Sequence, residues 1–104
     1  MAERLTLPHK GRSAEFMADY TLTERGGVIV ATEGWICAPR RGNEIMHIVM
    51  DELQSIASAR GKTVVHEYEA STPKGRNLIQ RFSEYQWAGR SATHNPIYKR
   101  EYKP

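Results

Sequence analysis

The sequence predicts a single α/β domain built on a mixed β-sheet, and three observations support this. Two strand-like segments, 15–24 and 28–37, are separated by only three residues and are expected to pair as an antiparallel hairpin. Residues 43–60 have the apolar spacing of a helix. A further strand-like segment follows at 63–70, so the helix is expected to connect two parallel neighbours.

Local signals justify the boundaries of these elements. Gly26 and Gly27 suit the hairpin turn, because glycine adopts positive φ without a Cβ clash. Asn43 is a good N-cap for the long helix, and Gly61 is a good stop for it. The segment 63–70 alternates as a strand, with Val64, His66 and Tyr68 on one side and Val65, Glu67 and Glu69 on the other.

A second helix is predicted over 73–85 and a last strand over 97–102, which gives the order ββαβαβ. Thr72 is a suitable N-cap, and Pro73 suits the first helical position. The apolar face of this helix is expected to be formed by Leu78, Phe82 and Tyr85.

The composition is that of a soluble globular protein. The chain has 104 residues, with 39% hydrophobic and 26% charged residues, which suits one domain. Residues 1–13 are expected to form an N-terminal arm, and residues 14–104 the domain. Cys37 is the single cysteine, so no intramolecular disulfide is expected. No apolar run resembles a membrane span or a signal peptide, and the expected location is therefore the cytoplasm.

The charge is distributed unevenly along the chain. Residues 43–70 carry a formal charge of −3, whereas residues 71–104 carry +5. A basic C-terminal third suggests an anionic partner such as nucleic acid, and a merely solvated surface is the alternative. The basic residues that would contact nucleic acid are Lys74, Arg76, Arg81 and Arg90.

The junction between the strand 28–37 and the long helix has the features of a phosphate site. The strand is broken by Ala38 and Pro39, and Arg40 and Arg41 follow directly before the helix. The free backbone N–H groups of a first helical turn and the aligned peptide dipoles favour an anion at such a position.

The segment from Val28 to Gly89 resembles the cofactor-binding half of the GNAT superfamily of acetyltransferases, particularly its very short members. In that family a strand leads through a Pro and an Arg-rich loop into a long helix, and a second strand and helix end in a Tyr-containing motif. The resemblance implies acetyl-CoA as cofactor, with its pantetheine arm between the strand ends at Cys37 and Ala70. It implies that the cofactor is held by Cys37, Arg40, Arg41, Gly42, Asn43, Glu44, Ile45 and Met46.

The same resemblance implies transfer of an acetyl group to an amine or protein substrate, which requires a base and an acid. Glu33 is the candidate base, and His66 and Glu67 are further candidates. The family's acid Tyr falls on Phe82 here, so Tyr85 is the nearest phenol and the candidate acid.

Three alternatives remain open on the sequence alone. Trp87, Tyr98 and Tyr102 alternate with basic residues, as in proteins that stack single-stranded nucleic acid, or they fill the core edge or a homodimer interface. The third alternative is a module that binds another protein and uses the GNAT-like scaffold only as a binding surface. His47 and Asp51 are interpreted as an ordinary polar pair, because no third metal ligand has matching spacing.

Overall fold

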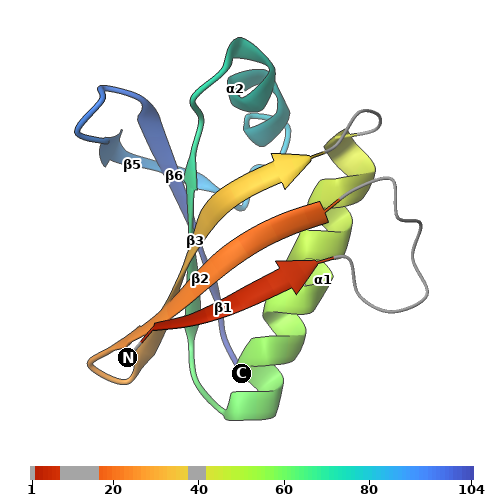
Figure 1. Ribbon diagram of the computed structural model, residues 1–104, viewed down its shortest axis with the longest axis vertical. Helices are drawn as coiled ribbons and strands as arrows, with labels where there is room; N and C mark the ends of the chain where they lie inside the picture. Colours follow the sequence, from red (N-terminus) through yellow and green to blue (C-terminus); the bar gives the residue numbers. More distant parts are fainter. Residues whose placement is uncertain (1, 8–16, 38–41) are drawn as a thin grey trace.

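The computed structural model of the chain describes residues 2–7, 17–37 and 42–104, which form a six-stranded sheet and two helices (Figure 1). In chain order the elements are β1 (Ala2–Leu7), β2 (Met17–Arg25), β3 (Val28–Cys37), α1 (Gly42–Arg60), β4 (Val64–Glu69), α2 (Pro73–Ile79), β5 (Gln86–Arg90) and β6 (Pro96–Tyr102).

The strands lie in the order β1-β2-β3-β4-β6-β5. The sheet is mixed, because β3 and β4 are parallel while the other neighbouring strands are antiparallel. The predicted hairpin is confirmed, since β2 and β3 are antiparallel and joined at Gly26 and Gly27. The predicted crossover is also confirmed, since α1 connects β3 to its parallel neighbour β4. Within the predicted N-terminal arm, β1 pairs along β2 and forms one edge of the sheet. Residues 8–13 of that arm lie outside the described residues.

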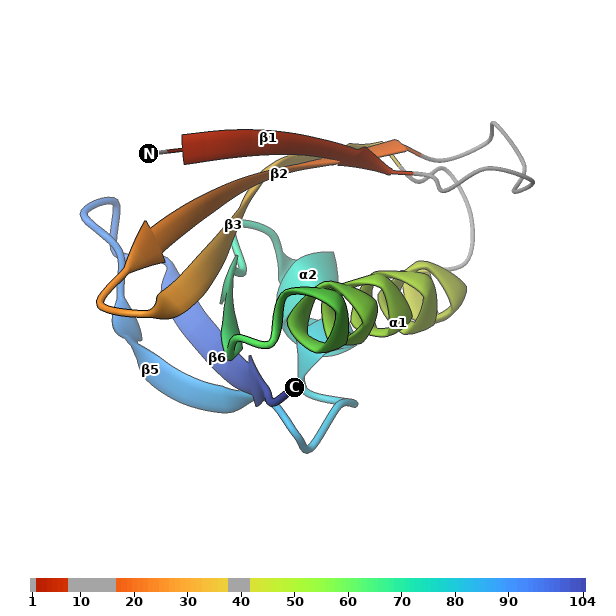
Figure 2. The same cartoon turned by 90° about the horizontal axis from the view of Figure 1, so that it is seen from below.

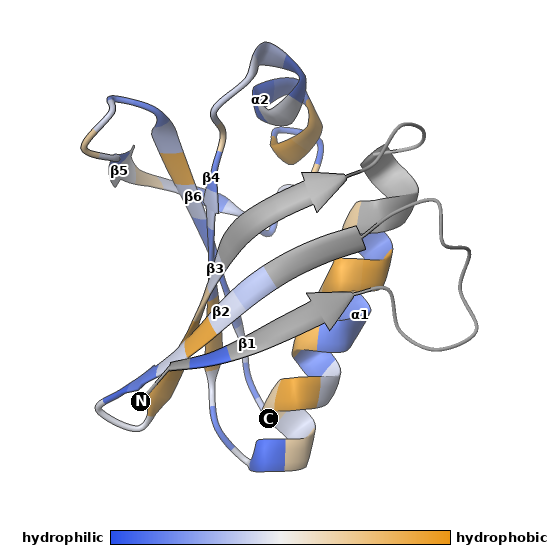
Figure 3. Ribbon diagram, viewed as in Figure 1, coloured by the Kyte–Doolittle hydropathy of each residue, from blue (hydrophilic) through white to orange (hydrophobic). Residues whose placement is uncertain are grey.

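Both helices lie against the same face of the sheet, which curls around them (Figure 2). The long helix presents an apolar stripe to this face, and apolar and polar residues alternate along it (Figure 3). The stripe is formed by the buried residues Met46, Val49, Leu53 and Ala57. It packs on strand residues of the same face, which include Leu22, Ala31, Val64 and Tyr102. No helix of the described ranges is both long enough and apolar enough to span a bilayer.

The predicted helix over 73–85 is wrong in length, because α2 ends at Ile79. Its start is as predicted: the Thr72 side chain accepts a hydrogen bond from the Gly75 N–H at 3.0 Å. After Ile79 the chain continues in turns, and the N–H of Phe82 bonds the carbonyl of Ile79 at 3.1 Å. Successive tight turns repeat about every three residues, so they bury Phe82 and Tyr85 at nearly the spacing that a helix would.

The strand β5 is not predicted by the sequence, since it lies at the sheet edge and is largely exposed. It pairs with β6, and the loop between them is fastened to the end of β4. The Glu69 carboxylate accepts hydrogen bonds from Asn95 Nδ2 at 2.9 Å, Ser91 Oγ at 3.2 Å and Thr93 Oγ1 at 3.3 Å. These donors hold the pKa of Glu69 below its ordinary value, with the Asn95 amide as the largest cause.

Acid should therefore loosen this hairpin. A lowered pKa means that the stabilisation by Glu69 is complete above its unfolded value and is lost as the pH falls below about 4.5. We expect the thermal midpoint of Glu69→Gln to depend less on pH between about 5 and 3 than that of the wild type. Circular dichroism melts measure this dependence, with Glu101→Gln as the matched control. Equal acid sensitivity of Glu69→Gln and the wild type would contradict the assignment.

Candidate functional site

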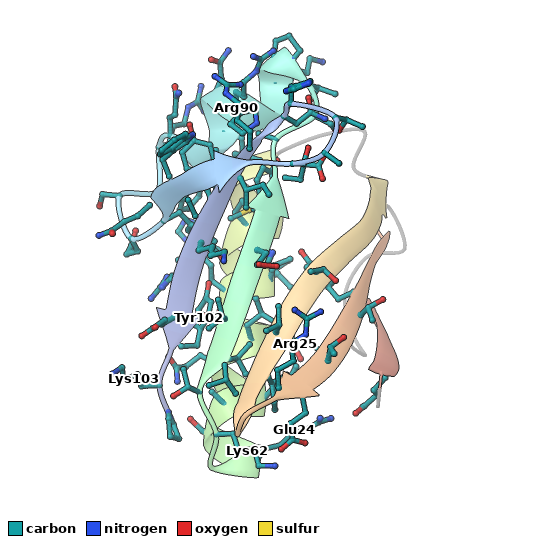
Figure 4. The ribbon with its side chains drawn as sticks, turned by 90° about the vertical axis from the view of Figure 1, so that its left-hand side faces the viewer. Glu24, Arg25, Lys62, Arg90, Tyr102 and Lys103 are labelled. Carbon is teal, nitrogen blue, oxygen red and sulfur yellow. The ribbon has the colours of Figure 1, made fainter. Side chains whose placement is uncertain are left out.

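The two central parallel strands separate toward their carboxyl ends. Pairing between β3 and β4 joins Ile29–Thr32 to Val64–Glu67 and, among the described residues, goes no further. Beyond Thr32, β3 continues to Cys37 on the side of β2 only, and beyond Glu67, β4 continues on the side of β6 only. The divergence is visible in two views at right angles (Figures 1 and 4).

The gap lies between the end of β3, which pairs with β2, and the end of β4, which pairs with β6. The long helix α1 begins at Gly42, five residues after β3 ends at Cys37. The N-terminal end of a 19-residue helix thus follows directly on the strand that lines the gap. The chain therefore combines two diverging strand ends with a helix N-terminus, whose free N–H groups favour an anion.

The predicted cofactor residues run from the end of β3 into the start of α1 along the chain. Cys37 is the last residue of β3 and pairs with Met17 through its backbone. Arg40 and Arg41 lie outside the described residues. The backbone of residues 42–45, which are Gly42, Asn43, Glu44 and Ile45, forms the start of α1, and their side chains lie outside the described part. Met46 is different, because its side chain is 1% exposed and belongs to the hydrophobic core.

Tyr85, the candidate acid, is part of a buried chain of hydrogen bonds. Its hydroxyl lies 2.5 Å from His66 Nδ1 and 2.7 Å from the Tyr102 hydroxyl. The three residues come from the turn after α2, from β4 and from β6, so the chain connects separate parts of the core. Burial raises the pKa of the Tyr102 phenol above its ordinary value.

The candidate bases occupy different environments. His66 is 0% exposed, and its ring meets those of Tyr20, Tyr68 and Tyr85 edge-on at centroid distances of 5.4, 6.2 and 5.3 Å. It is therefore a hydrogen-bonded core residue. Glu67 Oε2 forms an ion pair with Lys99 Nζ at 3.2 Å. The backbone of Glu33 pairs opposite Tyr20 just beyond the last β3–β4 pair, and its side chain lies outside the described part.

Close approach of the backbone to a phenol explains one glycine near the gap. A Cβ added to Gly75 would lie 2.9 Å from the Tyr68 hydroxyl and 3.2 Å from Thr72 Oγ1. Tyr68 is buried and is the first residue of β4 beyond the pairing with β3. Thus α2 lies against Tyr68, and a side chain at position 75 would require the Tyr68 hydroxyl to shift.

The basic residues proposed to contact nucleic acid are exposed but spread over several elements. Lys74 and Arg76 lie on α2, Arg81 lies in the turn that follows, and Arg90 ends β5. Arg90 Nη1 donates to the carbonyl of His94 at 2.9 Å. Trp87, on the same strand as Arg90, is 62% exposed.

His47 belongs, with Asp51, to the pair that the sequence predicts to be ordinary polar residues. The His47 ring packs edge-on against Phe82 at 5.4 Å. Among the described residues, no group of three or more His, Cys, Asp or Glu side chains is arranged to hold a metal ion.

Comparison with protein-family models, curated proteins and solved structures gives no significant match for this chain.

Proposed function

We propose that this chain is an acetyltransferase-like domain that binds acetyl-CoA between β3 and β4 and transfers its acetyl group to an amine, as the GNAT resemblance implies. The observation that carries the proposal is the divergence of the two parallel strands beyond Thr32 and Glu67, beside the start of α1. The succession of strand, long helix, parallel strand and short helix supports it, since the resemblance implies the same order.

The gap suits the pantetheine arm of acetyl-CoA. That arm is extended and contains two amide groups, which need hydrogen-bond partners when they leave water. Beyond Thr32, β3 pairs with β2 on one side, and its other side can offer backbone N–H and C=O groups to such a ligand, as a sheet edge does to an added strand. Arg40, Arg41 and the free N–H groups at the start of α1 would then hold the pyrophosphate.

The transfer needs few groups from the protein. Acetyl-CoA supplies an acetyl carbon activated by its thioester bond to sulfur. In the proposed reaction Glu33 takes a proton from the substrate ammonium, so that the amine nitrogen can bond to the acetyl carbon as the carbon–sulfur bond breaks. The sulfur leaves as a thiolate and requires a proton. Tyr85 is the donor that the resemblance proposes. The structure adds no support for this role, because the Tyr85 hydroxyl is buried between His66 and Tyr102.

Calorimetric titration of the purified chain with acetyl-CoA tests the proposal. We expect saturable binding that weakens by about 1–3 kcal/mol in Arg40→Ala/Arg41→Ala, the scale of charge-assisted hydrogen bonds to phosphate. The absence of heat or of a thermal shift at millimolar acetyl-CoA would refute it.

A second double variant separates a specific site from a general effect of charge. The double variant Arg25→Ala/Lys103→Ala also removes two positive charges, but at the opposite end of the sheet. Arg25 ends β2 and pairs with the first residue of β3, and Lys103 follows Tyr102, which pairs with the first residue of β4. This control should bind acetyl-CoA as the wild type does. Equal weakening of both double variants would indicate a nonspecific attraction.

A further inference from the structure

The strand β5 contains a bulge that turns two of its side chains to one face of the sheet. Trp87 pairs with Tyr98 of β6, Arg90 pairs with Pro96, and the register is irregular between the two pairs. Tyr98 and Pro96 are separated by one residue on β6, so they point to the same face. Because partners in an antiparallel pair share a face, Trp87 and Arg90 lie on that face too.

This shared face is the one that carries the helices. Tyr98 pairs with the buried Tyr68 of β4 and packs against the hydrophobic core. Gln80, the residue after α2, donates through Nε2 to the Tyr98 hydroxyl at 3.5 Å. Arg90 lies at the end of the sheet that carries α2 (Figure 4). The helices leave Trp87 uncovered, since its side chain is 62% exposed.

The charges of β4, β6 and β5 are separated between the two faces of the sheet. Arg90 and Arg100 occupy helix-facing positions, opposite Pro96 and the buried His66. The acids of these three strands all alternate with the helix-facing residues and lie on the other face; they are Glu67, Glu69 and Glu101. The face that presents Trp87 is therefore the basic one.

The segment around α2 adds positive charge on the same side. Residues 70–83 contain Lys74, Arg76 and Arg81, all exposed, and no acidic residue.

Glu84 borders this surface, with Oε2 at 3.9 Å from Arg100 Nη1. That nitrogen is buried and makes no hydrogen bond within the described part of the chain, so Glu84 balances the charge only loosely.

We propose that a single-stranded nucleic acid binds this surface, here called the Trp87 surface and formed by Lys74, Arg76, Trp87, Arg90 and Tyr98. A base stacks on the exposed ring of Trp87, since every base offers a π-face. The basic side chains attract the phosphates. A duplex fits less well, because its bases already stack on one another. This binding needs no acetyl-CoA and does not rest on the proposed function.

Fluorescence anisotropy of labelled octamers of thymidylate and of uridylate tests the proposal on the whole chain. At about 100 mM salt we expect a dissociation constant of about 10⁻⁶–10⁻⁴ M, which rises with added salt as counterions are released. A hairpin duplex should bind at least about fivefold more weakly. The two octamers distinguish DNA from RNA, since a contact to the 2′-hydroxyl favours the uridylate.

Variants separate stacking from charge. Trp87→Ala should weaken octamer binding by about 5- to 100-fold, whereas Trp87→Phe keeps a ring and should stay within about threefold of the wild type. Far-UV circular dichroism verifies that each variant is folded.

The charge contacts are tested with a pair of double variants. Lys74→Gln/Arg76→Gln should weaken binding and lower the slope of log affinity against log salt by about one to two. The matched control is Arg25→Gln/Lys103→Gln, which removes two charges at the opposite end of the sheet (Figure 4). It should bind within about twofold of the wild type, because salt at this concentration screens charges more than about 10 Å away.

Three results would overturn the proposal. The first is unchanged anisotropy of both octamers at about 0.5 mM protein. The second is octamer binding that is insensitive to Trp87→Ala, or that both double variants weaken equally. The third is tighter binding of a hexaglutamate peptide than of either octamer, which would assign the Trp87 surface to an acidic protein partner.

Discussion

Replacement of Tyr85 with phenylalanine should lower the free energy of unfolding by about 2–4 kcal/mol. The substitution removes only the hydroxyl that lies between His66 Nδ1 and the Tyr102 hydroxyl. Both partners are almost fully buried, at 0% and 1% exposure, so water cannot replace the missing group. Each buried polar group that loses its partner costs about 1–3 kcal/mol. Urea unfolding followed by circular dichroism measures the loss.

Tyr98→Phe is the matched control, because it deletes the same group from a half-buried tyrosine. The Tyr98 hydroxyl has a long contact of 3.5 Å with Gln80 Nε2, and its loss should cost less than about 1 kcal/mol. Equal losses in the two variants would show that the chain of Tyr85, His66 and Tyr102 is not a stabilising unit.

The variant Tyr85→Phe also distinguishes two roles for Tyr85, one in stability and one in catalysis. If Tyr85 is only structural, Tyr85→Phe should keep the acetyl transfer rate per folded molecule when it is assayed below its unfolding transition. If Tyr85 is the acid, as the family resemblance implies, the rate should fall by about 10²–10⁴-fold while acetyl-CoA affinity is retained. The second result would mean that its hydroxyl leaves the buried chain during the reaction.

The parts of the fold that the sequence predicts well have local causes. The hairpin depends on Gly26 and Gly27, which have φ values of 57° and 82° in the structure. The end of the long helix depends on Gly61, with φ of 61°. Each of these signals comes from a few adjacent residues and is independent of what packs around them. The parallel crossover then follows from the order of the elements and from the right-handed connection rule.

The parts that the sequence misses are decided by tertiary contacts. Phe82 and Tyr85 are buried at nearly helical spacing, yet they come from turns, since spacing alone does not distinguish a helix from a series of tight turns. The hydrogen bonds of Tyr85 join residues that are 19 and 17 positions away in sequence. No local pattern indicates such a pairing. The strand β5 is likewise missed, because it is an exposed edge strand without clear alternation.

Met46 provides the sharpest contrast between a role inferred from resemblance and the position seen in the structure. The resemblance places Met46 in the cofactor loop, whereas its side chain is 1% exposed within the core formed by α1 and the sheet. Met46→Ala should therefore lower the free energy of unfolding by about 2–5 kcal/mol through the cavity it leaves. Denaturant unfolding measures this loss.

Met46→Leu isolates packing from binding, because leucine preserves most of the side-chain volume and should cost less than about 1.5 kcal/mol. A core role for Met46 means that Met46→Leu binds acetyl-CoA within about twofold of the wild type, a difference of less than about 0.5 kcal/mol. Affinity lost in Met46→Leu without loss of stability would instead place the Met46 side chain at the cofactor. The start of α1 would then contact the ligand through side chains as well as through its backbone.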